Sequence, residues 1–166
     1  IVPAEPRNEA ERIADLHALR ILDTPPEERF DEIVQLAAAV LDAPIAYIAL
    51  VDSARQWFKA KCGVRPDQTG REYRSAVSDS DNPLVVDDPR IRFYAGHPLT
   101  GPAGCNVGTF CIASSQPRSL KPDELALFRR FARLAERQLH LVDLVRTQHE
   151  LIEVKNTLVA AQNRLR

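Results

Sequence analysis

Apolar residues recur at helical spacing in the N-terminal part of the chain. The first such run is formed by Ile13, Leu16, Leu19 and Leu22. It is followed by "DTPPEERF", whose two prolines end one helix and precede the next. The pattern predicts helices over residues 8–22 and 27–41, and the second has a broad apolar face that should cover a sheet.

The middle of the chain shows the patterns of β-strands. "IAYIALV" (45–51) is apolar throughout, as in a central strand, and "QWFKAKC" (56–62) follows after a short turn. Alternation in the second strand predicts two faces, with the lysines on the wetter one: Phe58, Ala60 and Cys62 against Trp57, Lys59 and Lys61. Further strands at 83–86, 91–99 and 106–113 would complete an antiparallel meander of five or six strands, with Ile48 or Ala49 facing the helices.

The C-terminal third reads as one long helix, since neither proline nor glycine occurs after Pro122. Up to about residue 140 its apolar positions form a buried stripe. Beyond that point leucines recur every seventh residue, accompanied by Thr147, Val154 and Ala161, at Leu144, Leu151, Leu158 and Leu165. We therefore expect a domain over residues 1–140 and a parallel coiled-coil homodimer through residues 141–166.

Composition and charge narrow the class of partner. The chain has 166 residues, 45% of them hydrophobic, and 22 basic side chains stand against 23 acidic ones. A near-neutral chain has no global field that would attract DNA, RNA or an anionic membrane, so the aromatic and basic stretch "RQWFKAKCG" (55–63) is interpreted as core rather than as a nucleic-acid site. No apolar run is long enough to span a membrane and no targeting peptide is visible; the start at Ile1 is typical of a piece of a longer protein.

The three cysteines, Cys62, Cys105 and Cys111, include no C-x-x-C pair, so neither a disulfide framework nor a metal site is expected. This usage favours a cytoplasmic location. We expect Cys62 and Cys111 to be buried and inert, and Cys105, in a turn, to be the most accessible. No Ser-His-Asp, Cys-His-Asp or paired-carboxylate pattern stands out, and the segment is not expected to be an enzyme.

Three motifs in fixed order carry a family resemblance: "ILDTPPEERFD" (21–31), "RQWFKA" (55–60) and "FYAGHPL" (93–99). Together with "VGTFCIA" (107–113), they make residues 8–140 similar to a subgroup of bacterial GAF domains. The resemblance implies an α+β, PAS-like fold with a central antiparallel sheet, N- and C-terminal helices on one face and a small-molecule pocket on the other. It also implies a sensor placed ahead of an output domain, a diguanylate cyclase or a histidine kinase, but it names no ligand and no cofactor.

The segment 71–96 is shorter here than in that subgroup. Either part of the pocket cover is lost, or residues are omitted, in which case the backbone should be interrupted between Tyr73 and Ile91. A pocket is expected between this segment and the sheet face away from the helices. Alternation allows only one of Phe93 and Tyr94 to face it. The candidate lining residues are Tyr73, Arg92, Phe93, Tyr94, Phe110 and Cys111.

Three functions remain open at this point. The first is a sensor that dimerises and transmits a small-molecule or redox signal through its C-terminal helix to a fused output domain. The second is a dimerisation module without a ligand, which a filled pocket would favour. The third is a free methionine sulfoxide reductase of the GAF type, which would need reactive cysteines on the pocket loops.

Overall fold

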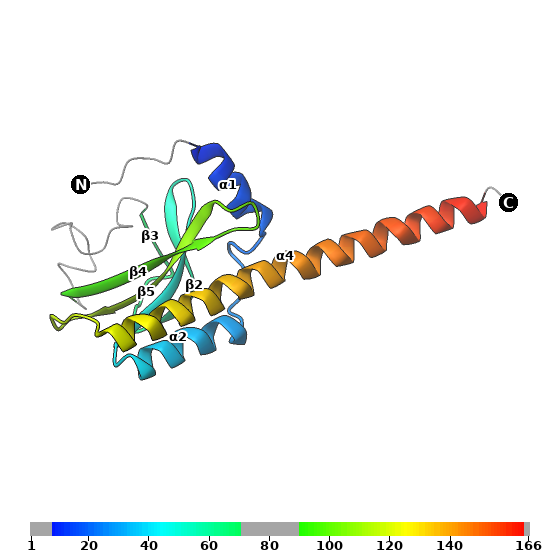
Figure 1. Cartoon of the computed structure of the whole chain (residues 1–166). Helices are drawn as coiled ribbons and strands as arrows, with labels where there is room; N and C mark the ends of the chain where they lie inside the picture. Colours follow the sequence, from blue (N-terminus) through cyan, green and yellow to red (C-terminus); the bar gives the residue numbers. More distant parts are fainter. Residues whose placement is uncertain (1–7, 71–89, 165–166) are drawn as a thin grey trace.

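The computed structural model describes residues 8–70 and 90–164. Helices and strands follow one another in the order expected of an α+β domain (Figure 1). Their bounds are α1 Glu9–Ala18, α2 Glu28–Val40, β1 Ile45–Val51, β2 Arg55–Cys62, β3 Gln68–Gly70, β4 Phe93–Thr100, β5 Asn106–Ser114 and α4 Pro122–Arg164. The predicted strand at 83–86 and the predicted interruption between Tyr73 and Ile91 fall on residues 71–89, outside the described residues.

The five strands form one antiparallel sheet in the order β3-β2-β1-β5-β4. The α+β class and the antiparallel pairing are therefore confirmed. The predicted meander is wrong in one respect, because β1 lies at the centre and pairs with the distant β5 as well as with β2. The apolar sequence of β1 is explained by this position, since a central strand is buried on both faces.

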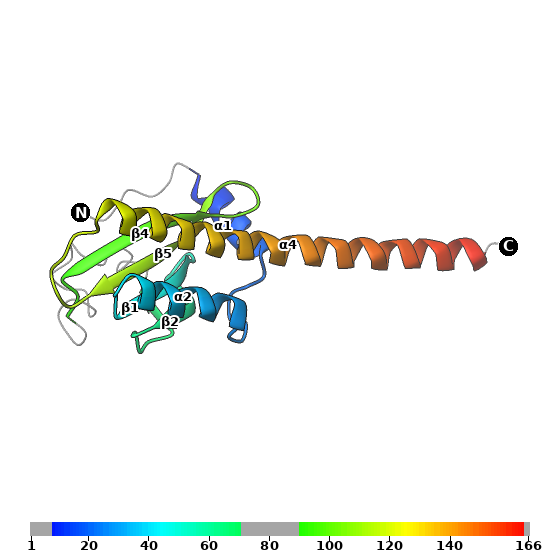
Figure 2. The same ribbon diagram turned by 60° about the horizontal axis from the view of Figure 1, so that its bottom comes forward.

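Helices α2 and α4 lie side by side and antiparallel on one face of the sheet (Figures 1 and 2). Ile48 of β1 faces this helical layer, whereas Ala49 faces away from it. Phe110 of β5 packs on Phe128 of α4 with 5.5 Å between ring centroids. The core on this side combines residues from all three helices, among them Leu16, Phe30, Val34, Ala132 and Leu139.

Helix α1 is fixed at one end of the sheet by two buried charged side chains. Asp15 accepts hydrogen bonds from the backbone N–H groups of Ala103 and Cys105, at 2.9 and 3.0 Å. Arg12 donates to the carbonyl of Val51 at 2.6 Å and pairs with Glu9. The Asp15 carboxylate thus accepts the hydrogen bonds of two backbone N–H groups in the turn between β4 and β5, and these bonds join α1 to the β4–β5 hairpin.

Strand β2 contains a β-bulge, and its two lysines do not share one wet face as predicted. Ile48 pairs with Ala60 and the next residue, Ala49, pairs with Phe58, so Lys59 has no partner on β1. Trp57 and Lys59 alternate with Phe58 and both face the helices, where the Lys59 side chain is fully buried instead of lying on a wet face. The extra residue then places Ala60 on the same face as Lys59 and Lys61 on the face of Tyr47, so strict two-residue periodicity was the wrong assumption for this strand.

The buried ammonium of Lys59 is satisfied by the segment that precedes α2. Its Nζ donates to Thr24 Oγ1 and to the carbonyl of Pro25, both at 2.9 Å, and it forms an ion pair with Glu27. The same Nζ lies 5.4 Å from the ring centroid of Phe30. Lys59 therefore ties β2 to the start of α2, and a buried lysine is tolerated here because each of these contacts compensates its lost hydration.

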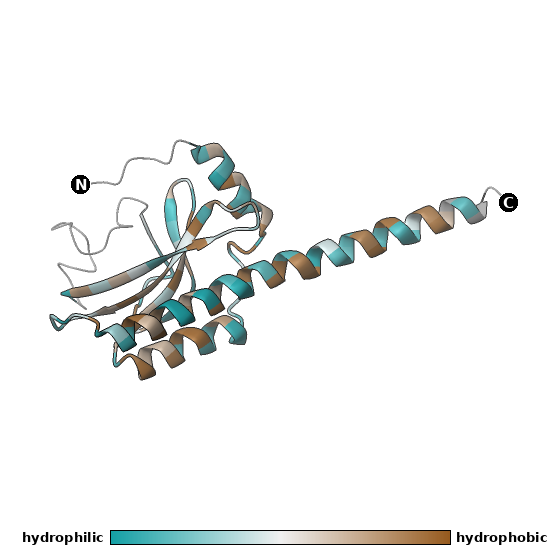
Figure 3. Cartoon of the chain, viewed as in Figure 1, coloured by the Kyte–Doolittle hydropathy of each residue, from teal (hydrophilic) through white to brown (hydrophobic). Residues whose placement is uncertain are grey.

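Helix α4 continues without interruption for 43 residues and projects beyond the rest of the domain (Figure 1). Leu139 is its last fully buried side chain. In the projecting half the heptad leucines are exposed, with 53% of Leu144, 63% of Leu151 and 65% of Leu158 accessible, and apolar positions recur along the whole half (Figure 3). The division into a domain and a coiled-coil segment at residue 140 stays a prediction. Among the described residues, no helix is long and apolar enough to cross a membrane.

Candidate functional site

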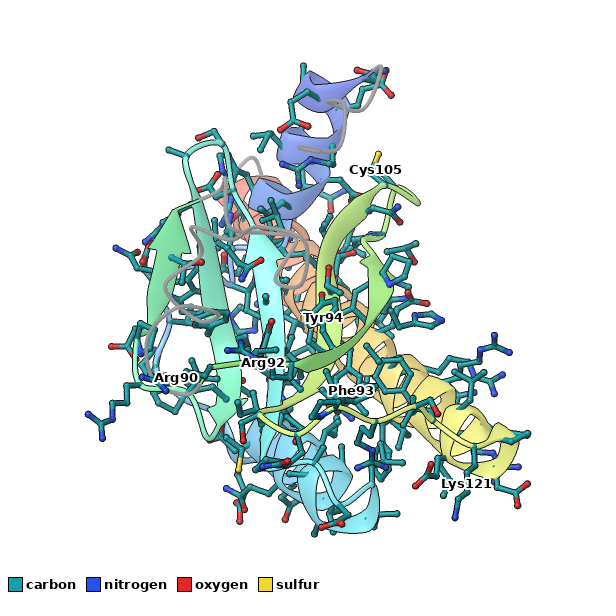
Figure 4. All side chains as sticks on the ribbon, turned by 90° about the vertical axis from the view of Figure 1, so that its left-hand side faces the viewer. Arg90, Arg92, Phe93, Tyr94, Cys105 and Lys121 are labelled. Atoms are coloured by element: carbon teal, nitrogen blue, oxygen red, sulfur yellow. The ribbon has the colours of Figure 1, made fainter. Side chains whose placement is uncertain are left out.

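Three polar side chains meet on the sheet face that points away from α2 and α4. Tyr47 of β1 and Cys111 of β5 are paired across the two strands, and their side chains share one face. Tyr94 of β4 reaches the same point, with its Oη 3.0 Å from Cys111 Sγ. We call these three residues the Tyr-Cys-Tyr cluster; they come from three adjacent strands, and Figure 4 shows where Tyr94 lies on β4.

A glycine makes this contact between strands possible. Gly96 is the residue of β4 directly opposite Cys111, and Tyr94 precedes it by two positions on the same face. A Cβ at position 96 would lie 2.5 Å from the Oη of Tyr94. Because glycine has no side chain, the Tyr94 ring lies over β4 and extends to the thiol.

The surroundings of the cluster are apolar and closely packed. Tyr47 is 2% exposed and Cys111 is 1% exposed, while Tyr94 is half-buried. The Tyr47 ring meets that of Phe58 edge-on, with 5.0 Å between centroids. The rest of the face is aliphatic and consists of Ile45, Ala49, Val64, Ile91 and Ala113.

This burial sets the protonation of the cluster. Burial raises the pKa of the Cys111 thiol to about 12, although its hydrogen bonds with Tyr94 and Tyr47 favour the thiolate. Burial also raises the pKa of Tyr47 and of Tyr94 well above the ordinary tyrosine value. All three groups are therefore neutral at physiological pH. They can exchange hydrogen bonds with a neutral polar group, but Cys111 is not an activated nucleophile.

The structure brings together only part of the predicted pocket lining. Tyr94 and Cys111 are in direct contact, as described above. Phe93 and Phe110 must be corrected: both belong to the helix-side core, because they alternate with Tyr94 and Cys111 along their strands. Phe93 packs instead under Arg118, whose guanidinium carbon lies 5.5 Å from the ring centroid. Whether any of these residues contacts a ligand stays a prediction.

Two further predicted residues are not part of the cluster. Arg92 is exposed just before β4, and its Nη1 donates to the carbonyl of Ile91 at 3.0 Å (Figure 4). Tyr73 lies outside the described residues. Conversely, Tyr47 and Gly96 were missed. The sequence could have indicated Tyr47, because it is the single residue with a polar group in the apolar strand "IAYIALV". It could not have indicated Gly96, whose role depends on which strands are neighbours.

The remaining cysteines are not part of the cluster. Cys105 follows the turn between β4 and β5, near α1 (Figure 4). Cys62 ends β2 and packs beside the helix-side core. Both cysteines are partly exposed, so the expectation of a buried Cys62 beside an accessible Cys105 is wrong. Among residues 8–70 and 90–164, no group of three His, Cys, Asp or Glu side chains is placed to hold a metal ion.

The strand that carries Tyr94 is bonded at its other end to α4. The backbone N–H of Thr100, the last residue of β4, donates to Glu136 Oε2 at 2.8 Å. The carbonyl of the same residue accepts from His140 Nε2 at 2.9 Å. Glu136 and His140 are one helical turn apart, and they lie just where α4 leaves the domain.

Comparison with known proteins agrees with this architecture. The family model described as GAF domain matches residues 25–139. A cyclic di-GMP phosphodiesterase of Pseudomonas aeruginosa is 36% identical over 157 residues, in an alignment that covers 83% of this chain and 27% of that protein. The chain thus spans about a quarter of the length of that relative.

Two solved structures share the fold at low sequence identity. The blue-light absorbing form of the PixJ GAF domain from Thermosynechococcus elongatus has a TM-score of 0.57 at 13% identity, covering 91% of this chain and 96% of that one. The GAF domain of a protein described as a sensor histidine kinase, from Pseudomonas syringae pv. tomato, has a TM-score of 0.52 at 18% identity, covering 89% and 97%.

Proposed function

Because this chain belongs to the GAF domain family, we propose that it is a sensor whose Tyr-Cys-Tyr cluster responds to a small neutral molecule and whose α4 carries the response to a fused output domain. The observation that carries the proposal is the position of β4. One end of this strand holds Tyr94 against Cys111, and the other end is hydrogen-bonded to α4 through Thr100. A displacement of β4 at the cluster therefore acts directly on the helix.

The chemistry of the cluster defines the class of molecule that fits. Its hydroxyl and thiol groups are neutral and lie within an aliphatic face, so an ionic ligand would lose hydration without gaining a charged partner there. A largely apolar molecule with one hydroxyl or carbonyl group matches the site better. No cofactor is assigned.

The exposed leucines in the projecting half of α4 support a parallel homodimer, formed by the part of the helix that leads toward the output domain. Leu144, Leu151 and Leu158 leave a continuous apolar seam in water, and a second helix of the same sequence would bury it. Leu165, the fourth member of the predicted seam, lies outside the described residues. Parallel pairing would place two output domains together beyond residue 166.

The relative from P. aeruginosa supports an output in cyclic di-GMP turnover. Its name gives a phosphodiesterase, and this chain corresponds to only 27% of its length, so the remainder of that protein holds room for a catalytic domain. We propose that the present segment regulates such a domain, a diguanylate cyclase or a phosphodiesterase, and does not itself catalyse. A histidine kinase output rests on the family resemblance alone.

A dimerisation module without a ligand is the second candidate. It is favoured by one observation, which is that Tyr47 and Cys111 are almost completely covered by protein already. The reductase function is weakened by the raised pKa of Cys111 and by the separate positions of Cys105 and Cys62, because thiol chemistry requires a thiolate.

Native mass spectrometry of the chain purified from cells tests the sensor and the dimer together. The proposal expects a dimer that retains a small molecule, and a variant with Tyr94→Ala should lose that molecule while remaining dimeric. A dimer with no additional mass, unchanged by this substitution, would favour the ligand-free module. A monomer would contradict both.

The seam is tested with a matched pair of variants. Leu151→Glu with Leu158→Glu places charge in the seam, while His149→Glu with Asn156→Glu places the same charge at the outermost heptad positions. Light scattering should give a monomer for the first variant and a dimer for the second. If both variants keep the same mass, the seam does not hold the dimer.

A further inference from the structure

Three exposed arginines on α4 have no acidic partner in the described part of the chain. Arg130, Arg133 and Arg137 surround a shallow hollow beside Leu134. Several other arginines of the domain are paired, for example Arg55 with Asp23 at 2.6 Å and Arg118 with Glu124 at 2.9 Å. None of the ion pairs within residues 8–70 and 90–164 includes the three on α4, so a cationic ridge faces solvent.

The ridge occupies the heptad position of the leucine seam. Counting back by sevens from Leu144 leads to Arg137 and then to Arg130. In a parallel pair of helices, identical heptad positions of the two copies meet at the axis, so two Arg137 side chains would be forced together. Like charges in such contact are unfavourable. The two copies of α4 must therefore separate beside the globular part, and the arginines must face something other than each other.

The neighbouring helix carries the opposite charge. Glu28 and Glu32 lie on the exposed side of α2, opposite the residues that face the core, and no ion pair in the described segments includes them. Because α2 runs antiparallel beside α4, its acidic first turns lie toward the place where α4 leaves the domain (Figures 1 and 2). The acidic surface and the arginine ridge are thus at similar heights along α4.

Apolar side chains remain exposed on the same two helices. Leu36 and Val40 of α2 are 56% and 54% exposed, and Leu127 and Leu134 of α4 are 37% and 43% exposed. A surface with leucines flanked by acidic residues on one helix and by arginines on its neighbour is complementary to itself under a two-fold axis. This favours a second copy of the chain over an unrelated partner.

We propose that Arg130, Arg133 and Arg137 of one copy bind Glu28 and Glu32 of α2 in a second copy, and that the four exposed apolar residues are buried between them. This rests on the dimer of the proposed function and specifies its contacts in the globular part. The two-fold axis makes each contact twice, giving a bundle of four helices in which α4 of one copy lies against α2 of the other. Such pairing would also fix the parallel orientation and the register of the seam.

Two charge-reversed chains test this arrangement. The acidic chain carries Arg133→Glu and Arg137→Glu, and the basic chain carries Glu28→Arg and Glu32→Arg. Each homodimer then contains like charges in both contacts, so sedimentation should show dissociation constants at least about tenfold above that of the unaltered chain. Mixed together, the two chains restore attraction in both contacts, and a heterodimer as tight as the original dimer is expected.

Several results would overturn the proposal. Homodimers of the charge-reversed chains that are as tight as the original, or a mixture that forms no heterodimer while both chains keep native circular dichroism, exclude the pairing. Unchanged dimers together with binding of inorganic phosphate that is lost in the acidic chain would assign the arginines to a small anion instead. The contribution of the leucine seam to the dimer is measured separately, because the variant with Leu151→Glu and Leu158→Glu keeps all the charged residues of the proposed contacts.

Discussion

Tyr94 and Thr100 stand at the two ends of the eight-residue strand β4, and they connect it to opposite sides of the molecule. The Oη of Tyr94 lies 3.0 Å from Cys111 Sγ on the face away from the helices. The backbone of Thr100 is bonded to Glu136 and His140 of α4. A single edge strand therefore joins the candidate ligand site to the helix that leaves the domain.

The bond between Thr100 and Glu136 should hold the exit of α4 in place. Glu136→Ala removes the acceptor of the Thr100 N–H, and we expect a loss of about 1 kcal/mol in the free energy of unfolding. Hydrogen exchange should become faster at Thr100 and in the adjoining turn of α4. Glu153→Ala, on the exposed projecting half of the same helix, is the control and should change neither quantity.

Gly96 should be required for the position of Tyr94. In Gly96→Ala the new methyl group would lie 2.5 Å from the Oη of Tyr94, so the ring must move. We expect a destabilisation of about 1–3 kcal/mol, measured by urea unfolding. Adding Tyr94→Leu removes the obstructing atoms, and the Gly96→Ala change should then cost much less. Equal costs in both backgrounds would show that the ring and the glycine are not coupled.

Lys59 should stabilise the fold although it is charged. Lys59→Met keeps the length of the side chain but leaves Glu27, Thr24 and the Pro25 carbonyl without their donor, so a loss of about 1–3 kcal/mol is expected. Lys61→Met is the matched control: Lys61 donates to the carbonyls of Arg65 and Pro66 and pairs with Asp67, but it is partly exposed and Asp67 almost fully so, and its loss should cost less than that of Lys59. Similar losses for both lysines would contradict a special role for the buried ammonium of Lys59.

The buried thiol should make the fold sensitive to alkaline pH. Burial raises the pKa of Cys111 to about 12 from the ordinary thiol value of 9.0, so the folded chain holds this proton where the unfolded chain has released it. The associated stability is complete below about pH 9 and is lost as the pH rises toward 12. Cys111→Ser keeps a hydroxyl but does not titrate. Its free energy of unfolding should fall less steeply between pH 8 and pH 10.5, by up to about 1.4 kcal/mol per pH unit.

The parts of the fold that sequence alone predicted are those with a strong local signal. The helices and four of the five strands follow from hydrophobic periodicity, and the exposed seam at Leu144, Leu151 and Leu158 follows from a repeat of seven. Strand β3 was missed because three residues, Gln68–Gly70, carry no periodicity.

The remaining features depend on the pairing of strands. The bulge that places Lys59 and Ala60 on one face arises from the register between β1 and β2, and nothing within "RQWFKAKCG" marks it. The contact of Tyr94 with Cys111 depends on Gly96 lying opposite the thiol, which requires β4 beside β5. Alternation alone does not say which of two neighbouring residues faces the helices, so the sequence names Phe93 beside Tyr94 and Phe110 beside Cys111, and the structure places the two phenylalanines on the helix side.

The distance between the two copies of α4 tests the central claim most directly. A spin label at Asn156→Cys, in a chain with Cys62→Ser and Cys105→Ser, reports this distance by double electron–electron resonance, because Cys111 is buried and stays unlabelled. The account predicts one short distance in the dimer, and a shifted or broadened distribution when Gly96→Ala displaces Tyr94 at the other end of β4. An identical distribution in the still-folded variant, or no coupling between labels at all, would contradict the proposed connection from the cluster to the helix.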